Sequence, residues 1–494
     1  MNYAMRWLLA LLFLVASACG GKGASNEIRT TPLAKAPPAD TTPKAKEPPP
    51  ASAAARDVNF PPVARQTLPN GLELNTVEWR PLPVVNLRLV IRSGSATNPA
   101  NLPGLSQLVA TMLKEGTKKR SSSALAEEVD YLGARLNTGA DQDTVYISMS
   151  ALSQDIDKAL EIMADVALHP AFSEEELKKL KKRELDRLAL QEKDPNFIAA
   201  RTFYRTLYGE HPYAQVDTTT QVVEKLKRND LQRWHKSNFL ANRALLVVVG
   251  DVAADRVQKA AAQAFKKWKK GKLASAKTAT TPVRDKREIV VVDRPESVQS
   301  VILIGNLALR RSDPDFVRLE VANQVLGGSP ASRLFMDLRE RRSLTYGAYS
   351  SVGERVDTAA FRASAAVRNE VTEQAMSAFL EHLDRIVKEA PPQQELANAK
   401  QYLSDSFPLQ IDTPGKIAAM VAETRIFSLP DDYWDSFRSE IRNVKAEEAL
   451  EAGEPAGAGD ASPASRTVRS WPAAALATID ETQAAAADGT AIVL

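Results

Sequence analysis

Few side chains in this 494-residue sequence can bind a metal or act as a nucleophile, because it contains four histidines and one cysteine. A cysteine-rich zinc fold, a structural disulfide and an iron–sulfur centre all need more cysteines, so the count excludes them. Any metal site based on histidine has to draw on His169, His211, His235 and His382.

The spacing of these histidines does not favour a metal site. Two histidines that share a metal on a helix lie three or four positions apart. His235 and His382 fall on predicted charged helices without such a neighbour. His169 and His211 each precede a proline in a predicted turn. We therefore predict structural or surface roles for all four.

Composition limits the partners of the chain. It has 64 Lys and Arg against 61 Asp and Glu, a formal charge of +3, which is too small to favour nucleic acid as a partner. Hydrophobic residues make up 44% of the chain, so it can bury a core and is not mainly disordered.

The N-terminal segment reads as an export signal. A single Arg6 precedes an apolar run that is too short to span a bilayer, so we predict a signal peptide over residues 1–18. The run ends in Ala-Ser-Ala-Cys, which resembles a bacterial lipobox and predicts lipidation of Cys19; an ordinary signal with an incidental cysteine is the alternative. Residues 19–57 are rich in Pro, Ala and Lys and predict an extended tether.

The tether suggests a place in the cell. Gly20 follows the cysteine, where an aspartate would indicate inner-membrane retention. The resemblance therefore implies a lipid anchor in the outer membrane of a Gram-negative type of bacterium, with the body facing the periplasm.

The body begins near Val58 and its pattern predicts an α+β fold. Residues 84–93 alternate as a half-buried strand does, and 104–115 place apolar residues at helical spacing. Further helices are predicted at 122–133, 154–167, from Ser173 with Glu176 as a capping box, and at 230–238; strands are predicted near Leu136, at 144–149 and at 243–250.

The same order recurs in the second half. Strands are predicted at 288–293, 298–305, 346–352 and 359–366, and helices at 317–326, up to Arg341, at 370–388 and at 392–405. We infer two homologous units of roughly 200 residues, each a mainly antiparallel sheet covered by helices. The predicted boundaries are 58–265 for the N-terminal domain, 266–287 for a linker, 288–450 for the C-terminal domain and 451–494 for a low-complexity tail.

The tail interrupts the repeat. The first half ends with a buried strand at Leu245–Gly250, and no counterpart is predicted in the Ala- and Gly-rich sequence after Leu450. Either the second sheet is one strand short, or the reading frame changed near residue 452.

Several segments in order resemble the insulinase/pitrilysin family of zinc peptidases, the inverzincins. The resemblance covers about residues 60–450 and implies two units that close as a clamshell. The matching segments are LPNGL (68–72), VVNLRLVIRSGS (84–95), GLSQLVATMLKEGT (104–117), LNTGADQDTVYISM (136–149), YGEHPYAQ (208–215), ALLVVVGDV (244–252) and GGSPASRLFMDLRERRSLTYGAYS (327–350).

The family's zinc motif, His-x-x-Glu-His, is replaced here. Gln107 and Thr111 stand in place of the two histidines, and Ala110 in place of the water-activating glutamate. The downstream ligand would fall near Leu188–Ala189, where no carboxylate is in register. We therefore predict no metal and no cofactor in this chain.

The resemblance also implies residues that act on the substrate. Family members carry an Arg and a Tyr that hydrogen-bond the substrate carbonyl and its oxyanion, which corresponds to Arg339 and Tyr346 here. An arginine paired with helix carboxylates such as Asp337 and a packed tyrosine is the alternative. The stretch Asn137, Thr138, Gly139 and Ala140 corresponds to the strand edge that binds an extended peptide, or else is an ordinary sheet edge.

The loss of the metal ligands beside an intact Arg/Tyr pattern predicts the zinc-lacking subunit of a heteromeric zinc peptidase. Its partners would be a zinc-bearing chain of the same family and a peptide or unfolded protein. The alternatives are an inactive peptide-binding or assembly protein of the cell envelope, and a self-sufficient peptidase with an unrecognised site.

Overall fold

The structure is a computed structural model that describes residues 58–272, 280–282, 287–453 and 489–493. Residues Arg56–Leu494 form one compact unit. The predicted signal peptide, Cys19 and the tether to residue 57 lie outside the described residues. Within the described ranges, no helix is long and apolar enough to cross a membrane.

The first half contains a six-stranded sheet in the order β1-β2-β6-β3-β5-β4. All neighbours are antiparallel except the parallel pair of β2 and β6. The strands are β1 (Ala64–Thr67), β2 (Glu73–Glu78), β3 (Val84–Ile91), β4 (Arg135–Ala140), β5 (Val145–Leu152) and β6 (Ala244–Gly250).

Successive side chains of these strands point to opposite faces of the sheet, so each face carries a set of apolar side chains. Leu87, Leu89 and Ile91 join a core with the helices that cover the outer face of this sheet. The helices of this half are α2 (Leu105–Leu113), α3 (Ser122–Tyr131), α4 (Ile156–Leu168), α5 (Glu174–Gln191), α6 (Pro195–Tyr208), α7 (Thr220–Lys225), α8 (Arg228–Asn238) and α9 (Ala254–Ala264). Short 3₁₀ turns are η1 (Ser95–Thr97), η2 (Ser153–Asp155), η3 (Pro212–Ala214) and η4 (Ala241–Arg243).

The second half repeats this plan with the sheet order β7-β11-β8-β10-β9. Its strands are β7 (Ile289–Asp293), β8 (Gln299–Ala308), β9 (Thr345–Val352), β10 (Ala359–Arg368) and β11 (Gly489–Val493). Its helices are α10 (Phe316–Leu326), the π-helix η5 (Phe335–Arg341), α11 (Thr372–Lys388), α12 (Gln393–Ser406), α13 (Pro414–Ile426), α14 (Tyr433–Asn443) and α15 (Ala446–Gly453), with 3₁₀ turns η6 (Asn369–Val371) and η7 (Phe407–Gln410). The predicted α+β fold with an internal duplication is confirmed.

The end of the chain contradicts one of the two alternatives, the one in which the second sheet is one strand short. β11 lies between β7 and β8, the position that β6 occupies in the first sheet. Its direction differs, because β11 is antiparallel to β7 whereas β6 is parallel to β2. The predicted tail therefore contributes a strand to the second sheet.

The first half also ends later in the sequence than the predicted boundary. Trp268 is buried in the core of the first half and its indole N–H donates to the carbonyl of Phe239 at 2.8 Å. The first half therefore extends to at least Trp268, three residues past the predicted boundary at 265.

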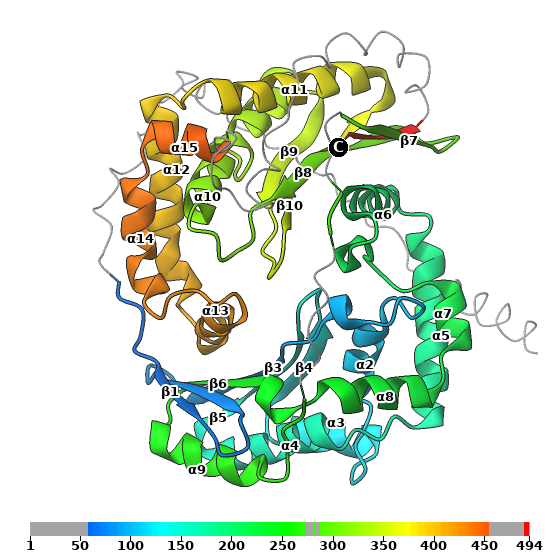
Figure 1. The fold of residues 1–494 in the computed structure, drawn as a ribbon, viewed down its shortest axis with the longest axis vertical. Helices are drawn as coiled ribbons and strands as arrows, with labels where there is room; N and C mark the ends of the chain where they lie inside the picture. Colours follow the sequence, from blue (N-terminus) through cyan, green and yellow to red (C-terminus); the bar gives the residue numbers. More distant parts are fainter. Residues whose placement is uncertain (1–57, 273–279, 283–286, 454–488, 494) are drawn as a thin grey trace, which may run out of the picture. The chain divides into compact units, whose positions relative to one another are not determined.

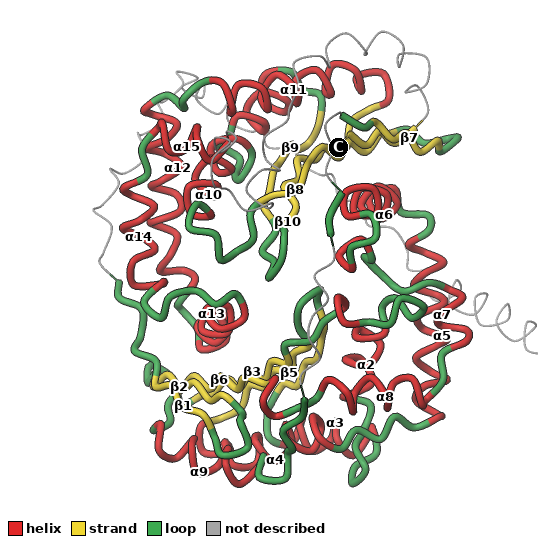
Figure 2. The backbone as a smooth tube through the Cα atoms, viewed as in Figure 1, coloured by secondary structure: helices red, strands yellow, loops and turns green. Residues whose placement is uncertain are grey.

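Each half contributes one helix to the other half's sheet. α13 packs on β3 and β6, where Ile417 and Val421 join Val247 and Val249 in one buried cluster. α6 packs on β8, and Phe203 is buried there. Figure 2 shows α13 over the first sheet and α6 beside the second. Each sheet is thus covered on its second face by a helix from the other half, as the predicted clamshell requires.

We expect Phe203→Ala to lower the free energy of unfolding by about 3–5 kcal/mol, because Phe203 is fully buried between α6 and the second sheet. The exposed Leu190, changed to Ala, is the matched control and should cost less than about 0.5 kcal/mol. Urea unfolding of both variants measures this. Equal costs would show that α6 does not bind the second sheet.

Candidate functional site

The three positions of the replaced zinc motif lie on α2. The side-chain carbonyl of Gln107 accepts the backbone N–H of Ala140 at 3.0 Å. The Thr111 hydroxyl donates to the backbone carbonyl of Gln107 at 2.9 Å. Ala110 is fully buried in the first core. An amide, a hydroxyl and a methyl group do not fit the donor set of a zinc site.

The carboxylates near the expected downstream ligand are paired with arginines. Glu184 pairs with Arg187 at 2.7 Å, and Glu192 pairs with Arg201. Leu188 between them is buried. Among the described residues, no group of three His, Cys, Asp or Glu side chains could hold a metal ion.

Three of the four histidines hold structural hydrogen bonds. Nε2 of His382 donates to Asp337 Oδ2 at 2.9 Å, and Nε2 of His235 donates to the carbonyl of Ala167 at 2.8 Å. Burial lowers the pKa of His235 to about 4, so this side chain is neutral at pH 7. His211 caps η3 and lies 3.3 Å from Asp357. These contacts confirm the predicted structural roles.

The predicted peptide-binding residues lie on β4, the open edge of the first sheet. The backbone N–H of Asp141 donates to the carbonyl of Thr144, next to β5. Because bonding alternates along an antiparallel strand, the backbone groups of every second residue before Asp141 also point to β5. Leu136, Thr138 and Ala140 therefore direct their backbone groups to the open side. Gln107 already occupies the N–H of Ala140, so the zinc-motif helix and the strand edge meet at this point.

Gly139 has a steric reason to be glycine. A Cβ at this position would lie 2.5 Å from the hydroxyl of Tyr146, whose ring covers β4. The guanidinium of Arg88 lies 4.7 Å from the centre of the same ring. Arg88, Tyr146 and Gly139 thus form a layer across three strands beside the open edge.

Arg339 and Tyr346 lie on consecutive elements of the second half that contact each other, η5 and β9. Arg339 is half exposed, pairs with Glu340 at 3.3 Å and lies over the ring of Phe335 at 4.8 Å. Tyr346 is 89% exposed. β9 is the edge of the second sheet and its pairing with β10 is irregular next to Tyr346, which turns this side chain outward.

The structure therefore brings the predicted residues together in two groups. Gln107 and Ala140 meet at the β4 edge, and Arg339 and Tyr346 share the start of the β9 edge. Within the described part of the chain, no hydrogen bond or ion pair joins the two groups. The paired-arginine alternative is partly realised, because Arg339 pairs with Glu340 and not with Asp337.

Sequence reasoning missed a buried charge cluster between α10, α13 and the turn after β9. Arg311 is 2% exposed, and its guanidinium donates to Glu354 at 3.0 Å and to the Tyr433 hydroxyl at 2.8 Å. Burial raises the pKa of Glu423 to about 7; Glu354 adds to the rise, whereas Arg311 opposes it. Burial also raises the pKa of Glu320 to about 7. No sequence signal pointed here, because α13 was not predicted.

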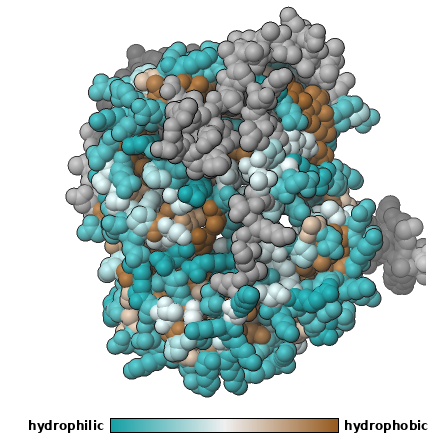
Figure 3. Space-filling model, viewed as in Figure 1, coloured by the Kyte–Doolittle hydropathy of each residue, from teal (hydrophilic) through white to brown (hydrophobic). Residues whose placement is uncertain are grey.

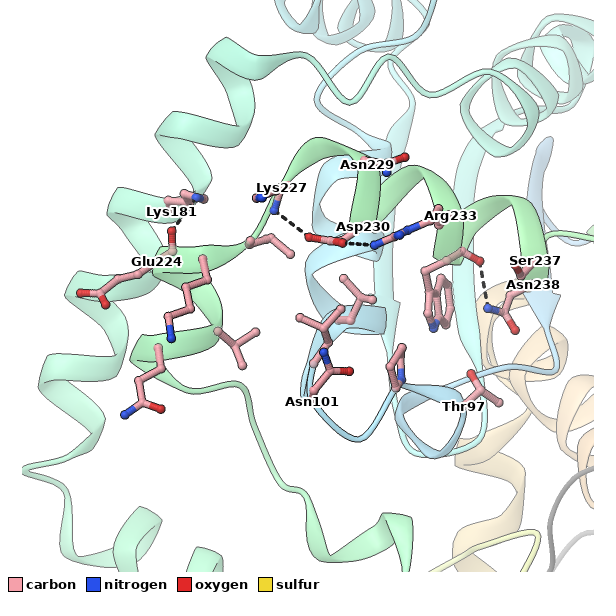
Figure 4. A pocket seen from close by; sticks show the side chains of 18 residues that line it. Thr97, Asn101, Lys181, Glu224, Lys227, Asn229, Asp230, Arg233, Ser237 and Asn238 are labelled. Atoms are coloured by element: carbon pink, nitrogen blue, oxygen red, sulfur yellow. Dashed lines mark hydrogen bonds and ion pairs between the residues drawn. The ribbon is translucent and has the colours of Figure 1, made fainter.

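A cavity of about 1140 Å³ lies between α5, α7, α8 and the segment before α2 (Figure 4). Arg233 pairs with Asp230 beside it, and Lys181 donates to the carbonyl of Glu224. Neither predicted group of residues lines this cavity. The face drawn in Figure 3 is mostly hydrophilic, and its hydrophobic residues form small separate patches.

Comparison with known proteins identifies the class of protein. The model for insulinase (peptidase family M16) matches residues 76–217, and the model for the peptidase M16 inactive domain matches residues 225–403. The chain belongs to the insulinase family, as the sequence segments indicated.

Curated relatives are distant but cover most of the chain. An uncharacterized zinc protease of Streptomyces coelicolor is 23% identical over 371 residues, 74% of this chain and 80% of the relative. A non-peptidase homologue of Helicobacter pylori is 25% identical over 373 residues, 74% of this chain and 85% of the relative. Relatives of this chain thus include proteins named as peptidases and one named as a non-peptidase.

Solved structures share the fold. The peptidase M16 inactive domain of Pseudomonas fluorescens superposes with a TM-score of 0.73 at 27% identity, over 79% of this chain and 94% of that one. A protease of Helicobacter pylori gives a TM-score of 0.76 at 17% identity, over 88% and 99%. The second likeness shows the fold alone.

We expect Gln107→Ala to speed hydrogen exchange at the Ala140 amide by about fivefold, because the change removes its one acceptor, worth about 1 kcal/mol. Thr111→Ala is the control, since its hydroxyl bonds only within α2. Amide exchange followed by NMR or mass spectrometry measures this. An unchanged rate in Gln107→Ala would show that the amide does not hold the edge strand.

We expect the free energy of unfolding to fall as pH rises from about 5 to about 8. Glu423 keeps its proton in the folded chain up to about pH 7, whereas the unfolded chain releases it near its ordinary value of 4.5. Glu423→Gln imitates the protonated form and should reduce this loss by on the order of 1–2 kcal/mol.

The exposed Glu447, changed to Gln, is the matched control for this pH series. Urea unfolding at several pH values measures the slope in each variant. The same slope in Glu423→Gln and in the parent chain would contradict a buried, protonated Glu423.

Proposed function

We propose that this chain is the zinc-lacking subunit of a heteromeric zinc peptidase, in which it binds peptide substrate and contributes Arg339 and Tyr346 to a site completed by a zinc-bearing partner. One observation carries the proposal. The zinc-motif positions are replaced and Gln107 is engaged by Ala140, whereas Arg339 and Tyr346 remain on an exposed edge.

The open edge of β4 supports peptide binding. Its outward N–H and C=O groups at Leu136 and Thr138 can pair with an extended peptide as an added strand. Main-chain pairing does not depend on the peptide's side chains, so this edge suits varied peptides or unfolded proteins. The backbone groups of Asn137 and Gly139 bond to β5, so these two residues hold the edge strand in its sheet.

The chemistry of Arg339 and Tyr346 suits a developing negative charge. A guanidinium and a phenol can both donate hydrogen bonds to an oxygen atom. Donors aimed at a substrate carbonyl stabilise the oxyanion more than the ground state, which lowers the barrier. The ion pair of Arg339 with Glu340 is exposed and weak, so a substrate can replace it.

The proposed location follows from the sequence before the body. Lipidation of Cys19 would anchor the chain, and the tether to residue 57 would hold the body away from the membrane. We propose the periplasmic side of an outer membrane.

A second candidate is an inactive peptide-binding or assembly protein of the cell envelope. The relative named as a non-peptidase homologue and the match to an inactive-domain model favour it. It shares the peptide-binding β4 edge with the first proposal but gives Arg339 and Tyr346 no role in cleavage.

We expect Arg339→Ala and Tyr346→Phe each to reduce peptide turnover by the complex roughly 100–1000-fold, the usual effect of losing one oxyanion donor. The complex is isolated from the source cells through a tag on this chain and assayed with a fluorogenic peptide. Arg442→Ala and Tyr402→Phe are matched controls, because both residues are exposed and lie on α14 and α12, which do not pack on β4, β9 or η5.

Two results would separate the candidates. Cleavage that is unaffected by Arg339→Ala and Tyr346→Phe contradicts the oxyanion role. Peptide binding without cleavage, by the chain or by the complex, favours the assembly protein.

A further inference from the structure

We propose that Asp143 and Tyr213 form a clasp that positions the two edge strands, β4 and β9, relative to each other. The proposal concerns how the site is assembled and rests on the proposed function for its catalytic consequence. In the described part of the chain, Asp143 and Tyr213 form no hydrogen bond or ion pair with Arg339 or Tyr346, so both are positioning residues.

The clasp joins two hairpin turns through one carboxylate. Asp143 lies in the turn between β4 and β5. Its Oδ1 accepts the hydroxyl of Tyr213, and its Oδ2 accepts the backbone N–H of Val356 at 3.2 Å. Val356 lies in the turn between β9 and β10, which Figure 1 shows pointing toward β4 and β5. A first-half turn thus holds a second-half turn directly.

The turn that carries Asp143 is itself fixed. Asp141 Oδ1 accepts the backbone N–H groups of Asp143 and Thr144, and Asp141 Oδ2 accepts the Thr144 hydroxyl. Its backbone carbonyl accepts Ser95 N–H at 2.8 Å. Asp143 is therefore presented from a rigid turn, one that begins directly after the last residue of β4.

The segment after α6 reinforces the second side of the clasp. The Tyr213 hydroxyl accepts the backbone N–H of Asp357 at 3.3 Å, and the Tyr208 hydroxyl donates to the carbonyl of Thr358 at 3.0 Å. His211 Nδ1 accepts the backbone N–H of Tyr213, so Nε2 carries the proton and faces Asp357. Three side chains of the segment 208–213 thus hold the turn after β9.

The two tyrosines of this region are buried, and Asp143 is half-buried. Tyr213 and Tyr208 are 3% and 2% exposed. Burial raises the pKa of the Asp143 carboxyl, and the hydrogen bonds from Tyr213 and Val356 oppose the rise. Separating the two turns would leave the buried Tyr213 hydroxyl without its carboxylate acceptor, which favours one arrangement of the two turns.

The arrangement matters because β4 and β9 are each the edge strand of a sheet. When the turn after β4 and the turn after β9 are held together, the relative orientation of these two edge strands is also fixed. A peptide paired with β4 then meets Arg339 and Tyr346 in one register. The sequence YGEHPYAQ, which the catalytic chemistry leaves unexplained, acquires this positioning role.

Pulsed electron paramagnetic resonance tests the geometry. Spin labels are placed at the exposed Arg135 on β4 and Ser351 on β9, each changed to Cys, in a full chain carrying Cys19→Ser. We expect one narrow distance distribution in this parent and in the control Tyr131→Phe, whose ring is 90% exposed. Asp143→Asn and Tyr213→Phe should broaden it, and the double variant should broaden it no further, because either change opens the same contact.

Peptide turnover by the isolated complex tests the consequence. We expect either clasp variant to lower turnover by roughly tenfold or more while KM stays within about twofold, since the peptide still pairs with β4. A lost hydroxyl that only stabilised the fold would lower the Tm and leave turnover per folded complex unchanged.

Each possible result of these two experiments leads to one conclusion. Parent-like distance distributions in both clasp variants overturn the clasp. Broadened distributions with unchanged turnover, where Arg339→Ala does reduce turnover, overturn its positioning role. Unchanged turnover in Arg339→Ala contradicts the proposed function instead, and the clasp is then decided by the distance distributions.

Discussion

The structure depends on two helices, one from each half, that each pack on the sheet of the other half. Each sheet is apolar on both faces, and the helices of its own half cover one face only. α13 covers the second face of the first sheet, and α6 does the same for the second sheet. Neither half can bury its sheet alone, so folding commits the two halves to one arrangement.

This exchange determines which parts of the sheets remain open. α13 packs on β3 and β6, away from the β4 edge. The first half contributes an open edge with Gln107 bound to Ala140, and the second contributes Arg339 and Tyr346 at the start of its own edge. The clasp of Asp143 then connects the hairpins that carry the two edges. The same burial that stabilises the fold thus leaves the proposed peptide-binding surfaces exposed.

The sequence predicted most strands and outer helices, because alternation and helical spacing mark elements with one buried face. α13 was not predicted, because its buried residues lie on several sides of the helix and form no single apolar stripe. α6 had a readable signal, an Asp194 cap followed by Pro195 and buried residues four apart, but nothing in the sequence showed which sheet it covers. Tertiary contacts alone create the charge cluster at Glu423 and bring Asp143 to Val356, so neither had a local pattern.

We propose that a partner supplies the metal chemistry, whereas this chain binds the substrate and supplies the oxyanion donors. The most direct measurement is the zinc content of this chain and of its isolated complex, with peptide cleavage assayed on both. We expect no stoichiometric zinc and no cleavage for the chain alone, and zinc with chelator-sensitive cleavage for the complex. Stoichiometric zinc in the chain alone, with cleavage that a chelator abolishes, would contradict it.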